Sequence, residues 1–351
     1  MISLTVQAEK QYQVSIGAMW PRELINLLEG RTRAAVIVSA GFSPDLTPVA
    51  NLDCELHLFQ VPDGEAGKTV DTLSTLWNWL GAVGFTRSDI VIGIGGGAVT
   101  DLAGFAAATW LRGVDWVAVP TSLAGMVDAA IGGKTGINSN YGKNLIGAFH
   151  SPIAVVIDPS WLKSLSDRDF AAGMAEVIKC GFIADPKILD LAKCNTVASL
   201  RDDLVTLTEL IRRAVVVKAE VVGVDFKESF AREVLNYGHT LGHAIEVQAK
   251  YQLRHGEAVS IGLIYAAELA AARGLLTSAE VALHRDILSC YGLPTSYQRA
   301  AWSKLTPMLA LDKKSRGNTI RFVALSGIGT TVRLEDLTST ELEQAYERIS
   351  S

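Results

Sequence analysis

The stretch Ile90-Val91-Ile92-Gly93-Ile94-Gly95-Gly96-Gly97-Ala98-Val99-Thr100-Asp101 joins a short apolar run to a helix-like segment. The apolar run predicts a buried strand, and residues 98–109 have apolar positions at helical spacing. Glycines in such a turn let the backbone approach a phosphate, and a helix N-terminus favours negative charge. Because the spacing is not G-x-G-x-x-G, the turn indicates either phosphate binding or a tight structural turn. Asp101 could cap the helix or hold a cofactor hydroxyl.

The flanking sequence repeats this alternation of strand and helix. We expect strands buried on both faces at residues 35–38, 56–59, 90–94, 116–119 and 154–157. Helical patterns at residues 68–83 and 98–109 between them predict a parallel sheet covered by helices. Polar residues also follow two other strands, at Pro62–Lys68 and at Pro120–Ser122. Since strand ends of a parallel sheet meet at one crevice, we expect a dinucleotide site there.

After Asp158 the apolar spacing becomes helical, as in residues 204–222 and 258–272. Only residues 320–325 and 330–333 look like strands again, and they predict a small hairpin. We therefore predict an α/β domain at residues 1–158 and a helical domain at residues 159–351.

Three of the six histidines, His239, His243 and His255, are clustered within 17 positions of the helical half. A carboxylate with two imidazoles makes a three-ligand zinc site with an open position, as in catalytic zinc sites. Glu176 is the candidate carboxylate. His239 and His243 are four residues apart and would share one helix face. Spacing alone fits two or three of the histidines as ligands.

Several basic residues could serve an anionic ligand. Lys134 and Lys143 each lie beside glycine, which is a common way to offer a cation to a phosphate or carboxylate, although a solvated loop lysine fits equally well. Four more cations, Lys218, Arg232, Lys313 and Lys314, would by default be scattered surface charges. Their convergence on one site is a hypothesis.

Composition narrows the class of protein. Of the 351 residues, 49% are hydrophobic and 20% are charged, which is typical of a folded globular protein. The formal net charge of −5 argues against a nucleic-acid partner. We find no signal peptide and no apolar run long enough for a membrane span. Four widely spaced cysteines without a CxxC pair are typical of free thiols, so we expect a cytoplasmic protein.

Taken together, the motifs resemble those of 3-dehydroquinate synthases. The resemblance covers roughly residues 60 to 325. It rests on Gly95–Phe149, Gly173–Lys179, Asn236–Glu246, His255–Val259 and Asp312–Lys314. Ser39-Ala40-Gly41 departs from the acidic residue that family members often carry after the second strand. The resemblance implies a Rossmann-like NAD domain followed by an all-α metal-binding domain, with the site in the cleft.

The resemblance also implies roles for individual residues. Glu176, His239 and His255 would ligate one divalent ion, zinc or cobalt, and His243 would contact the substrate and assist proton transfer. NAD would be held by Glu65, Lys68, Gly95, Gly96, Gly97, Asp101, Thr121, Ser122 and Lys143. The substrate would be bound by Asp128, Lys134, Asn144, Lys179, Lys218, Arg232, Asn236, His243 and Lys314, with Lys313 as the alternative to Lys314. Of these, Lys134, Asn144, Lys179, Arg232, Asn236 and His243 would take part in catalysis. Arg112 would reach the substrate phosphate from a neighbouring subunit, which implies a homodimer.

The implied reaction converts 3-deoxy-D-arabino-heptulosonate 7-phosphate into 3-dehydroquinate and phosphate, a step of aromatic amino-acid biosynthesis. NAD would oxidise a ring hydroxyl transiently, phosphate would be eliminated, the hydride would return, and an intramolecular aldol step would close the carbocycle. One alternative is a related cyclase acting on a sugar phosphate without a carboxylate, which would be expected to replace some of Arg232, Asn236 and Lys314. Two others are a metal-dependent polyol dehydrogenase, which usually has an aspartate in place of Glu176, and a non-catalytic descendant that binds NAD or metal.

Overall fold

The computed structural model describes the chain except residues 51, 228–230 and 316–319 and the side chains of residues 310–315. The described chain forms two compact units. Unit 1 comprises Met1–Leu165 and Lys218–Lys227, and unit 2 comprises Ser166–Val217 and Glu228–Ser351. The domain division at 158/159, with its assigned roles, stays a prediction.

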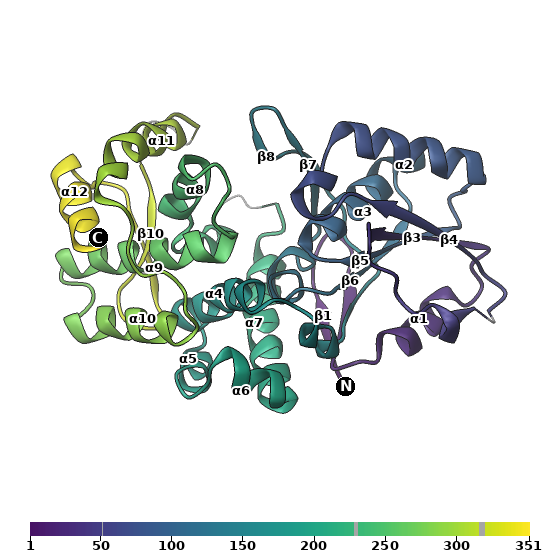
Figure 1. The fold of residues 1–351 in the computed structure, drawn as a ribbon, viewed down its shortest axis with the longest axis horizontal. Helices are drawn as coiled ribbons and strands as arrows, with labels where there is room; N and C mark the ends of the chain where they lie inside the picture. Colours follow the sequence, from purple (N-terminus) through teal and green to yellow (C-terminus); the bar gives the residue numbers. More distant parts are fainter. Residues whose placement is uncertain (51, 228–230, 316–319) are drawn as a thin grey trace. The chain divides into compact units, whose positions relative to one another are not determined.

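Unit 1 is built on a sheet that has seven strands among the described residues (Figure 1). Its order is β1 (Ile2–Val6), β2 (Tyr12–Ile16), β9 (Ala154–Ile157), β6 (Asp115–Pro120), β5 (Ile90–Gly95), β3 (Arg33–Ser39) and β4 (Glu55–Val61). All neighbours pair in parallel except β1 and β2, which are antiparallel. All five predicted strands and the predicted parallel sheet are confirmed, whereas β1 and β2 were not anticipated.

The expectation that residues 56–59 are buried on both faces is wrong. They belong to β4, which lies at the edge of the sheet, and Leu58 is 44% exposed. The inner strands β3 and β5 are buried almost throughout, because helices cover both of their faces.

Helices cover the two faces of this sheet in unit 1. On one face, α1 (Trp20–Leu28) packs Leu24 and Leu28 against alternate residues of β3, β5 and β6. On the other face lie α2 (Val70–Val83) and α3 (Gly97–Thr109), as Figure 1 shows. Helix α2 begins two residues later than the predicted start at Lys68, because the Thr69 side chain caps it by accepting from the Thr72 amide at 3.2 Å.

Unit 1 also contains an antiparallel hairpin of β7 (Lys134–Ser139) and β8 (Gly142–Phe149). Lys134 and Lys143 therefore lie on strands and not in a loop. The short helices of this unit are η1 (Thr47–Val49), η2 (Gly64–Gly67), η3 (Trp110–Arg112), the π-helical turn η4 (Gly125–Ala129) and η5 (Pro159–Lys163).

Unit 2 is mostly helical, as predicted. Its helices are α4 (Asp167–Ile183), α5 (Pro186–Ala192), α6 (Val197–Asp202), most of α7 (Leu204–Val224), η6 (Ala231–Asn236), α8 (His239–Gln248), α9 (His255–Ala272), α10 (Ser278–Cys290), η7 (Arg299–Ala301), α11 (Trp302–Ser315) and α12 (Ser339–Arg348). The predicted small hairpin is confirmed as β10 (Phe322–Leu325) paired antiparallel with β11 (Thr331–Leu334).

Helix α9 is the central helix of unit 2. Nearly all its residues from Gly256 to Ala270 are buried, as expected for a helix that is apolar on all sides. It packs against α4, α8, α10 and α12. None of the described helices combines the length and apolar character that a membrane span requires.

Candidate active site

Three helices of unit 2 bring Glu176, His239 and His255 together. Glu176 lies in the middle of α4, and the two histidines are the first residues of α8 and α9. The Nε2 atoms of His255 and His239 lie 3.3 and 3.5 Å from the same atom, Glu176 Oε1. One ligand atom from each residue lies within 4.8 Å of the other two.

Glycines allow these helices to approach so closely. A Cβ on Gly256 would lie 1.9 Å from the Ala172 carbonyl oxygen, so α9 touches the backbone of α4 one turn before Glu176. A Cβ on Gly262 would lie 1.8 Å from the carbonyl oxygen of Gly238, the residue before His239. Because backbone atoms cannot move aside as a side chain end can, only glycine fits at these two positions.

The three side chains fit a divalent metal ion. Glu176 is 2% exposed, and its Oε1 atom has no hydrogen-bond partner within the described part of the chain. Buried polar atoms without partners are rare and need an explanation. Ligand atoms about 2.0–2.1 Å from a tetrahedral ion lie about 3.3–3.4 Å from each other. The measured separations of 3.3 and 3.5 Å therefore suit two ligand pairs on one zinc-like ion.

Burial and local charge put two of these groups in the forms that bind metal. Burial would raise the pKa of Glu176, but the charge of Lys179, whose Nζ lies 2.5 Å from Glu176 Oε2, holds it well below its usual value. Burial and Lys179 lower the pKa of His239 to about 3. For His255, burial lowers the pKa, but Glu176 and Glu246 outweigh it and raise the pKa to about 10. A metal ion would have to displace a proton from His255.

His243 lies one turn after His239 on α8, with a ring-centroid separation of 5.3 Å, and it is exposed. It groups with Glu246 and His255 and not with Glu176. Glu246 was not among the predicted site residues. The signal that could have found it is its position seven residues after His239, two turns along the same helix face.

The predicted substrate-binding residues are found in both units. In unit 2, Lys179 and Arg232 are 2% and 1% exposed, and Asn236 ends η6. In unit 1, Lys218 donates to Asp128 Oδ1 at 2.5 Å and also to the Asp128 carbonyl. Lys134 begins β7 and is exposed. The side chains of Lys313 and Lys314 lie outside the described residues.

The predicted NAD residues of unit 1 include a buried polar network. Lys68, which is 1% exposed, donates to Asp101 at 2.7 Å and to the Asn144 side-chain oxygen. Asp101 does not cap α3, because the N-cap is Gly96. Burial raises the pKa of Asp101 to about 6, although Lys68 pulls it down. Glu65 is tied to this network through Asn138, which donates to Glu65 Oε2 at 2.6 Å and was not anticipated from the sequence.

The glycines of the turn after β5 have different surroundings. A Cβ on Gly95 would lie 2.7 Å from the Val99 side chain, and one on Gly97 would lie 2.9 Å from Ala129. A Cβ on Gly96 would meet nothing nearer than the Ser122 hydroxyl at 3.5 Å. Packing within unit 1 therefore accounts for Gly95 and Gly97 but not for Gly96. Thr121 lies beside this turn, since its amide donates to the Gly95 carbonyl at 2.9 Å.

The two remaining predicted residues lie in strand and turn segments of unit 1. Lys143 is on β8, partly buried, next to Asn144. Arg112 is exposed in η3 and has a φ of +67°. Its chain neighbours Leu111 and Gly113 have φ of +48° and +116°. Two consecutive non-glycine residues with positive φ are uncommon and mark strained backbone.

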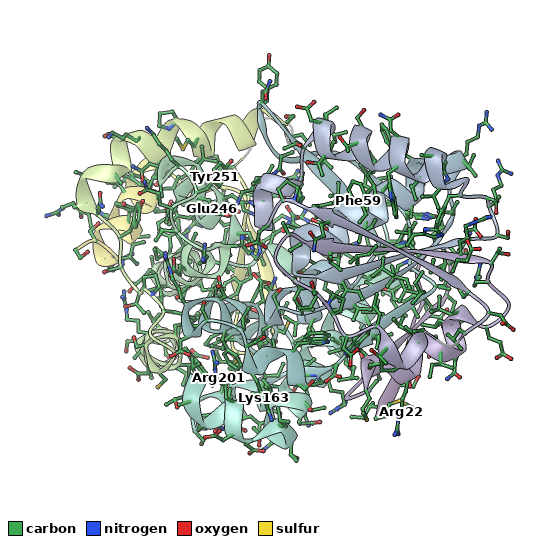
Figure 2. All side chains as sticks on the ribbon, turned by 45° about the vertical axis from the view of Figure 1, so that its right-hand side comes forward. Arg22, Phe59, Lys163, Arg201, Glu246 and Tyr251 are labelled. Atoms are coloured by element: carbon green, nitrogen blue, oxygen red, sulfur yellow. The ribbon has the colours of Figure 1, made fainter. Side chains whose placement is uncertain are left out.

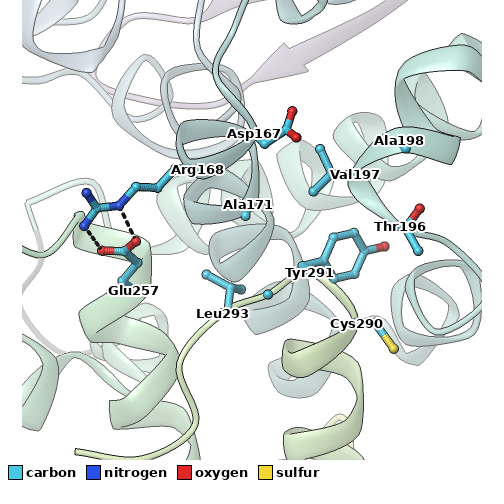
Figure 3. A pocket seen from close by; sticks show the side chains of 11 residues that line it. Asp167, Arg168, Ala171, Thr196, Val197, Ala198, Glu257, Cys290, Tyr291 and Leu293 are labelled. Atoms are coloured by element: carbon cyan, nitrogen blue, oxygen red, sulfur yellow. Dashed lines mark hydrogen bonds and ion pairs between the residues drawn. The ribbon is translucent and has the colours of Figure 1, made fainter.

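A separate pocket of about 430 Å³ lies in unit 2 (Figure 3). Its lining includes Arg168, Glu257, Cys290 and Tyr291 and none of the predicted site residues. Figure 3 shows Arg168 of α4 holding both carboxylate oxygens of Glu257, at 2.6 and 2.7 Å. Because Glu257 lies two residues after His255, this ion pair joins α4 to the start of α9.

Comparisons with known proteins identify the family of this chain. Residues 58–172 match the family model of the 3-dehydroquinate synthase N-terminal region, and residues 173–315 match that of the C-terminal region. A 3-dehydroquinate synthase of Mycolicibacterium vanbaalenii is 48% identical over 357 aligned residues, which cover 99% of this chain and 98% of that protein. The enzyme of the same name from Thermobifida fusca is 50% identical, covering 97% of this chain and 94% of that protein.

Two solved structures share the fold. ValA, a 2-epi-5-epi-valiolone synthase from Streptomyces hygroscopicus with NAD+ and Zn2+ bound, has a TM-score of 0.88 at 29% identity and covers 99% of this chain and 98% of its own. A 2-deoxy-scyllo-inosose synthase with carbaglucose-6-phosphate, NAD+ and Co2+ has a TM-score of 0.87 at 24% identity, with 99% and 100% covered. These matches confirm the predicted fold of this chain, but the sequence matches at 48–50% identity, which cover nearly the whole chain, carry a different name. This chain belongs to the 3-dehydroquinate synthase family.

Proposed function

We propose that this chain converts 3-deoxy-D-arabino-heptulosonate 7-phosphate into 3-dehydroquinate and phosphate. As a family member over its whole length, it is an NAD- and metal-dependent enzyme that acts on a sugar phosphate. The observation that carries the proposal is the metal-type grouping of Glu176, His239 and His255 beside the buried ammonium of Lys179.

In this proposal Glu176, His239 and His255 hold one divalent ion, zinc or cobalt. The unpartnered Glu176 Oε1 atom and its distances to the two imidazoles support this ligand set. When bound, NAD supplies a transient hydride acceptor and the ion supplies a Lewis acid for hydroxyl groups. Cobalt fits the same nitrogen and oxygen donors, so the donor set does not choose between the two metals.

We assign NAD to residues around the glycine turn of unit 1. A Cβ on Gly96 would make only ordinary contact with Ser122, so packing does not require glycine there. This supports close approach of a pyrophosphate, since a turn at a helix N-terminus offers backbone amides to an anion. Lys68, paired with Asp101, would hold that carboxylate in place for a cofactor hydroxyl. The complete proposed set is Glu65, Lys68, Gly95, Gly96, Gly97, Asp101, Thr121, Ser122 and Lys143.

The substrate carries a phosphate and a carboxylate, which together need several cations. Buried lysine and arginine side chains are rare unless their charge is used or paired. Three proposed substrate residues, Lys179, Lys218 and Arg232, are at least 94% buried. They would act as fixed charges that stabilise transient negative charge without reorganising. The other proposed contacts are Asp128, Lys134, Asn144, Asn236, His243 and Lys314.

We assign proton transfer to His243. It shares one face of α8 with the proposed ligand His239, but it is exposed and lies outside the group that contains Glu176. A neutral imidazole can accept a proton through one nitrogen and donate a proton through the other, which suits a reaction that needs proton transfer to and from the substrate. Lys134, Asn144, Lys179, Arg232 and Asn236 complete the proposed catalytic set.

A multiple-turnover assay tests the function. Protein supplied with the heptulosonate phosphate, Zn2+ and trace NAD should release phosphate far beyond the NAD present, since each turnover regenerates the cofactor. Phosphate release limited to one equivalent per NAD, or no phosphate release, would overturn the cyclase assignment. Sedoheptulose 7-phosphate, which lacks the carboxylate, should be a poor substrate, and equal rates would favour the related cyclase.

A metal analysis tests the ligand set separately. The variant Glu176→Ala should lose its metal equivalent, measured by elemental analysis after dialysis, because a three-ligand site loses most of its affinity with one ligand gone. Glu280→Ala is the control, since Glu280 caps α10 and contacts no proposed ligand. A full metal equivalent in Glu176→Ala would show that the ligand set is wrong.

We further propose a homodimer in which Arg112 serves the neighbouring subunit's site. Arg112 is exposed and lies on strained backbone, which supports a role in contact with another subunit. Mixing Arg112→Ala with Lys179→Ala protein tests this. If Arg112 acts across the dimer, mixed dimers contain one intact site and regain activity. If it acts within its own subunit, no mixture regains activity.

We propose a cytoplasmic location. All four cysteines, Cys54, Cys180, Cys194 and Cys290, are free thiols in the structure, which suits a reducing compartment. Cell fractionation followed by immunodetection would test this, and recovery in an exported fraction would contradict it.

A further inference from the structure

His255 lies between two carboxylates. Its Nε2 atom is 3.3 Å from Glu176 Oε1, and its Nδ1 atom is 3.1 Å from Glu246 Oε2. A neutral imidazole carries one proton and one lone pair on its two nitrogens. If the proton is on Nδ1, Glu246 accepts it in a hydrogen bond and the lone pair of Nε2 faces Glu176.

The other proposed ligand has the same orientation but a different outer partner. His239 also directs Nε2 towards Glu176 Oε1, while its Nδ1 lies 3.1 Å from the carbonyl oxygen of Tyr237. The outer acceptor of His239 is therefore a neutral carbonyl, and that of His255 is a carboxylate. A carboxylate forms the stronger hydrogen bond and makes the imidazole a more electron-rich ligand.

Glu246 is buried, and an ionised carboxylate is tolerated in a buried position only when it is paired. It is 4% exposed near the end of α8, where Figure 2 labels it with Tyr251. Burial of an ionised carboxylate costs several kcal/mol unless hydrogen bonds and opposite charge offset it. Its helix places it two turns beyond His239, so α8 supplies one proposed ligand directly and controls a second ligand on α9.

The grouping of His243, Glu246 and His255 is better explained by this arrangement than by a second metal ion. His255 Nε2 faces the proposed ion, so its Nδ1 must keep the proton. A protonated nitrogen cannot ligate a metal. Glu246 therefore acts on the first site through His255.

We infer that Glu246 is a positioning residue that fixes the tautomer and ring orientation of His255 and thereby sets the affinity of the metal site. This inference rests on the proposed ligand set. Loss of such an outer hydrogen bond typically lowers metal affinity about 10–100-fold.

The test uses purified full-length protein stripped of metal and titrated with Zn2+ against a chromophoric chelator. Glu246→Ala should raise the Zn2+ dissociation constant about 10–100-fold. Glu246→Gln keeps an acceptor of the same shape without the charge, and it should raise the constant by less. The Co2+-loaded variants should show shifted visible absorption bands, which a purely structural role would leave unchanged.

The matched control is Glu257→Gln. Glu257 is also a carboxylate at the start of α9, but it pairs with Arg168 and the Arg254 amide and not with an imidazole. This variant should keep the wild-type Zn2+ dissociation constant and Co2+ spectrum. If Glu246→Gln and Glu257→Gln both behave like the wild type, the inference is overturned, even if Glu246→Ala fails to fold.

The variant Glu176→Ala distinguishes a failure of the role inferred for Glu246 from a failure of the proposed ligand set. Metal loss in Glu176→Ala together with wild-type binding in Glu246→Gln would refute only the role of Glu246. Metal retention in Glu176→Ala would refute the ligand set itself.

Discussion

The glycine turn of unit 1 and the helices of unit 2 that carry the proposed metal ligands both depend on glycine, but for different reasons. In the turn, Gly95 and Gly97 are restricted by the side chains of Val99 and Ala129, and a Cβ on Gly96 would make only ordinary contact with Ser122. In the helices, Gly256 and Gly262 lie against backbone carbonyls of neighbouring helices. An added Cβ in the turn can be accommodated by moving a neighbouring side chain, whereas an added Cβ between two helices forces the helices apart. Substitutions should therefore have unequal effects in the two regions.

The largest expected effect is that of Gly256→Ala. The added Cβ would lie 1.9 Å from the Ala172 carbonyl oxygen, so α9 must move away from α4 and carry His255 away from Glu176. Overpacking of this kind costs about 3 kcal/mol. Loss of metal binding removes about 2.7 kcal/mol more at a metal concentration 100 times the dissociation constant. Thermal unfolding with and without Zn2+ measures both effects. A variant that keeps its Zn2+-dependent stabilisation would show that the added Cβ does not move His255 away from Glu176.

The next largest effect is expected for Lys68→Met in unit 1. It leaves Asp101 without its ammonium partner in a partly buried place, which should cost about 2 kcal/mol at pH 8. Burial already raises the pKa of Asp101 to about 6, and loss of Lys68 would raise it further. Because a protonated carboxyl has no charge to bury, the destabilisation should be small near pH 5 and grow as the pH rises through the raised pKa. Urea unfolding of both proteins at pH 5 and pH 8, without NAD, checks this, and an equal loss at both pH values would exclude Asp101 as the cause.

A smaller effect on stability but a specific effect on binding is expected for Gly96→Ala. Its Cβ meets the Ser122 hydroxyl at an ordinary 3.5 Å, so the fold should lose less than about 1 kcal/mol. If a pyrophosphate approaches this backbone, the methyl group should weaken NAD binding about 10-fold or more, as measured by calorimetry. Gly95→Ala is the comparison, because its clash with Val99 should lower stability before it affects binding. Unchanged NAD affinity in Gly96→Ala would favour a purely structural turn.

The smallest effect is expected for Gly81→Ala in α2. Gly81 is a helical glycine like Gly256, but its added Cβ would lie 3.5 Å from the side chain of Trp110. The substitution should stabilise the protein by about 0.5 kcal/mol, because alanine is the better helix former. A destabilisation similar to that of Gly256→Ala would show that glycine loss alone, and not the backbone clash, explains both variants.

The sequence supported good predictions where structure is local. The strands of unit 1, the turn after β5 and the small hairpin β10–β11 follow from runs of neighbouring residues, since side-chain period and turn residues act over short distances. Three local features were still misjudged or missed. The expectation that residues 56–59 are buried on both faces is wrong, the structure excludes the cap alternative for Asp101, and the sequence analysis did not anticipate strands β1 and β2. Each of these points concerns which partner a segment meets, and hydrophobic pattern does not specify this.

By itself, the sequence determined the kind of fold and the residue types of the proposed metal site, because a carboxylate and clustered imidazoles have few other uses together. Only the tertiary structure decided which atoms meet: His255 and His239 share Glu176 Oε1, Glu246 is aligned with the far side of His255, and Lys68 is paired with Asp101. These contacts join residues far apart in the chain. The positions of the groups are set by how closely α4, α8 and α9 pack, and that closeness depends on atoms that glycine lacks.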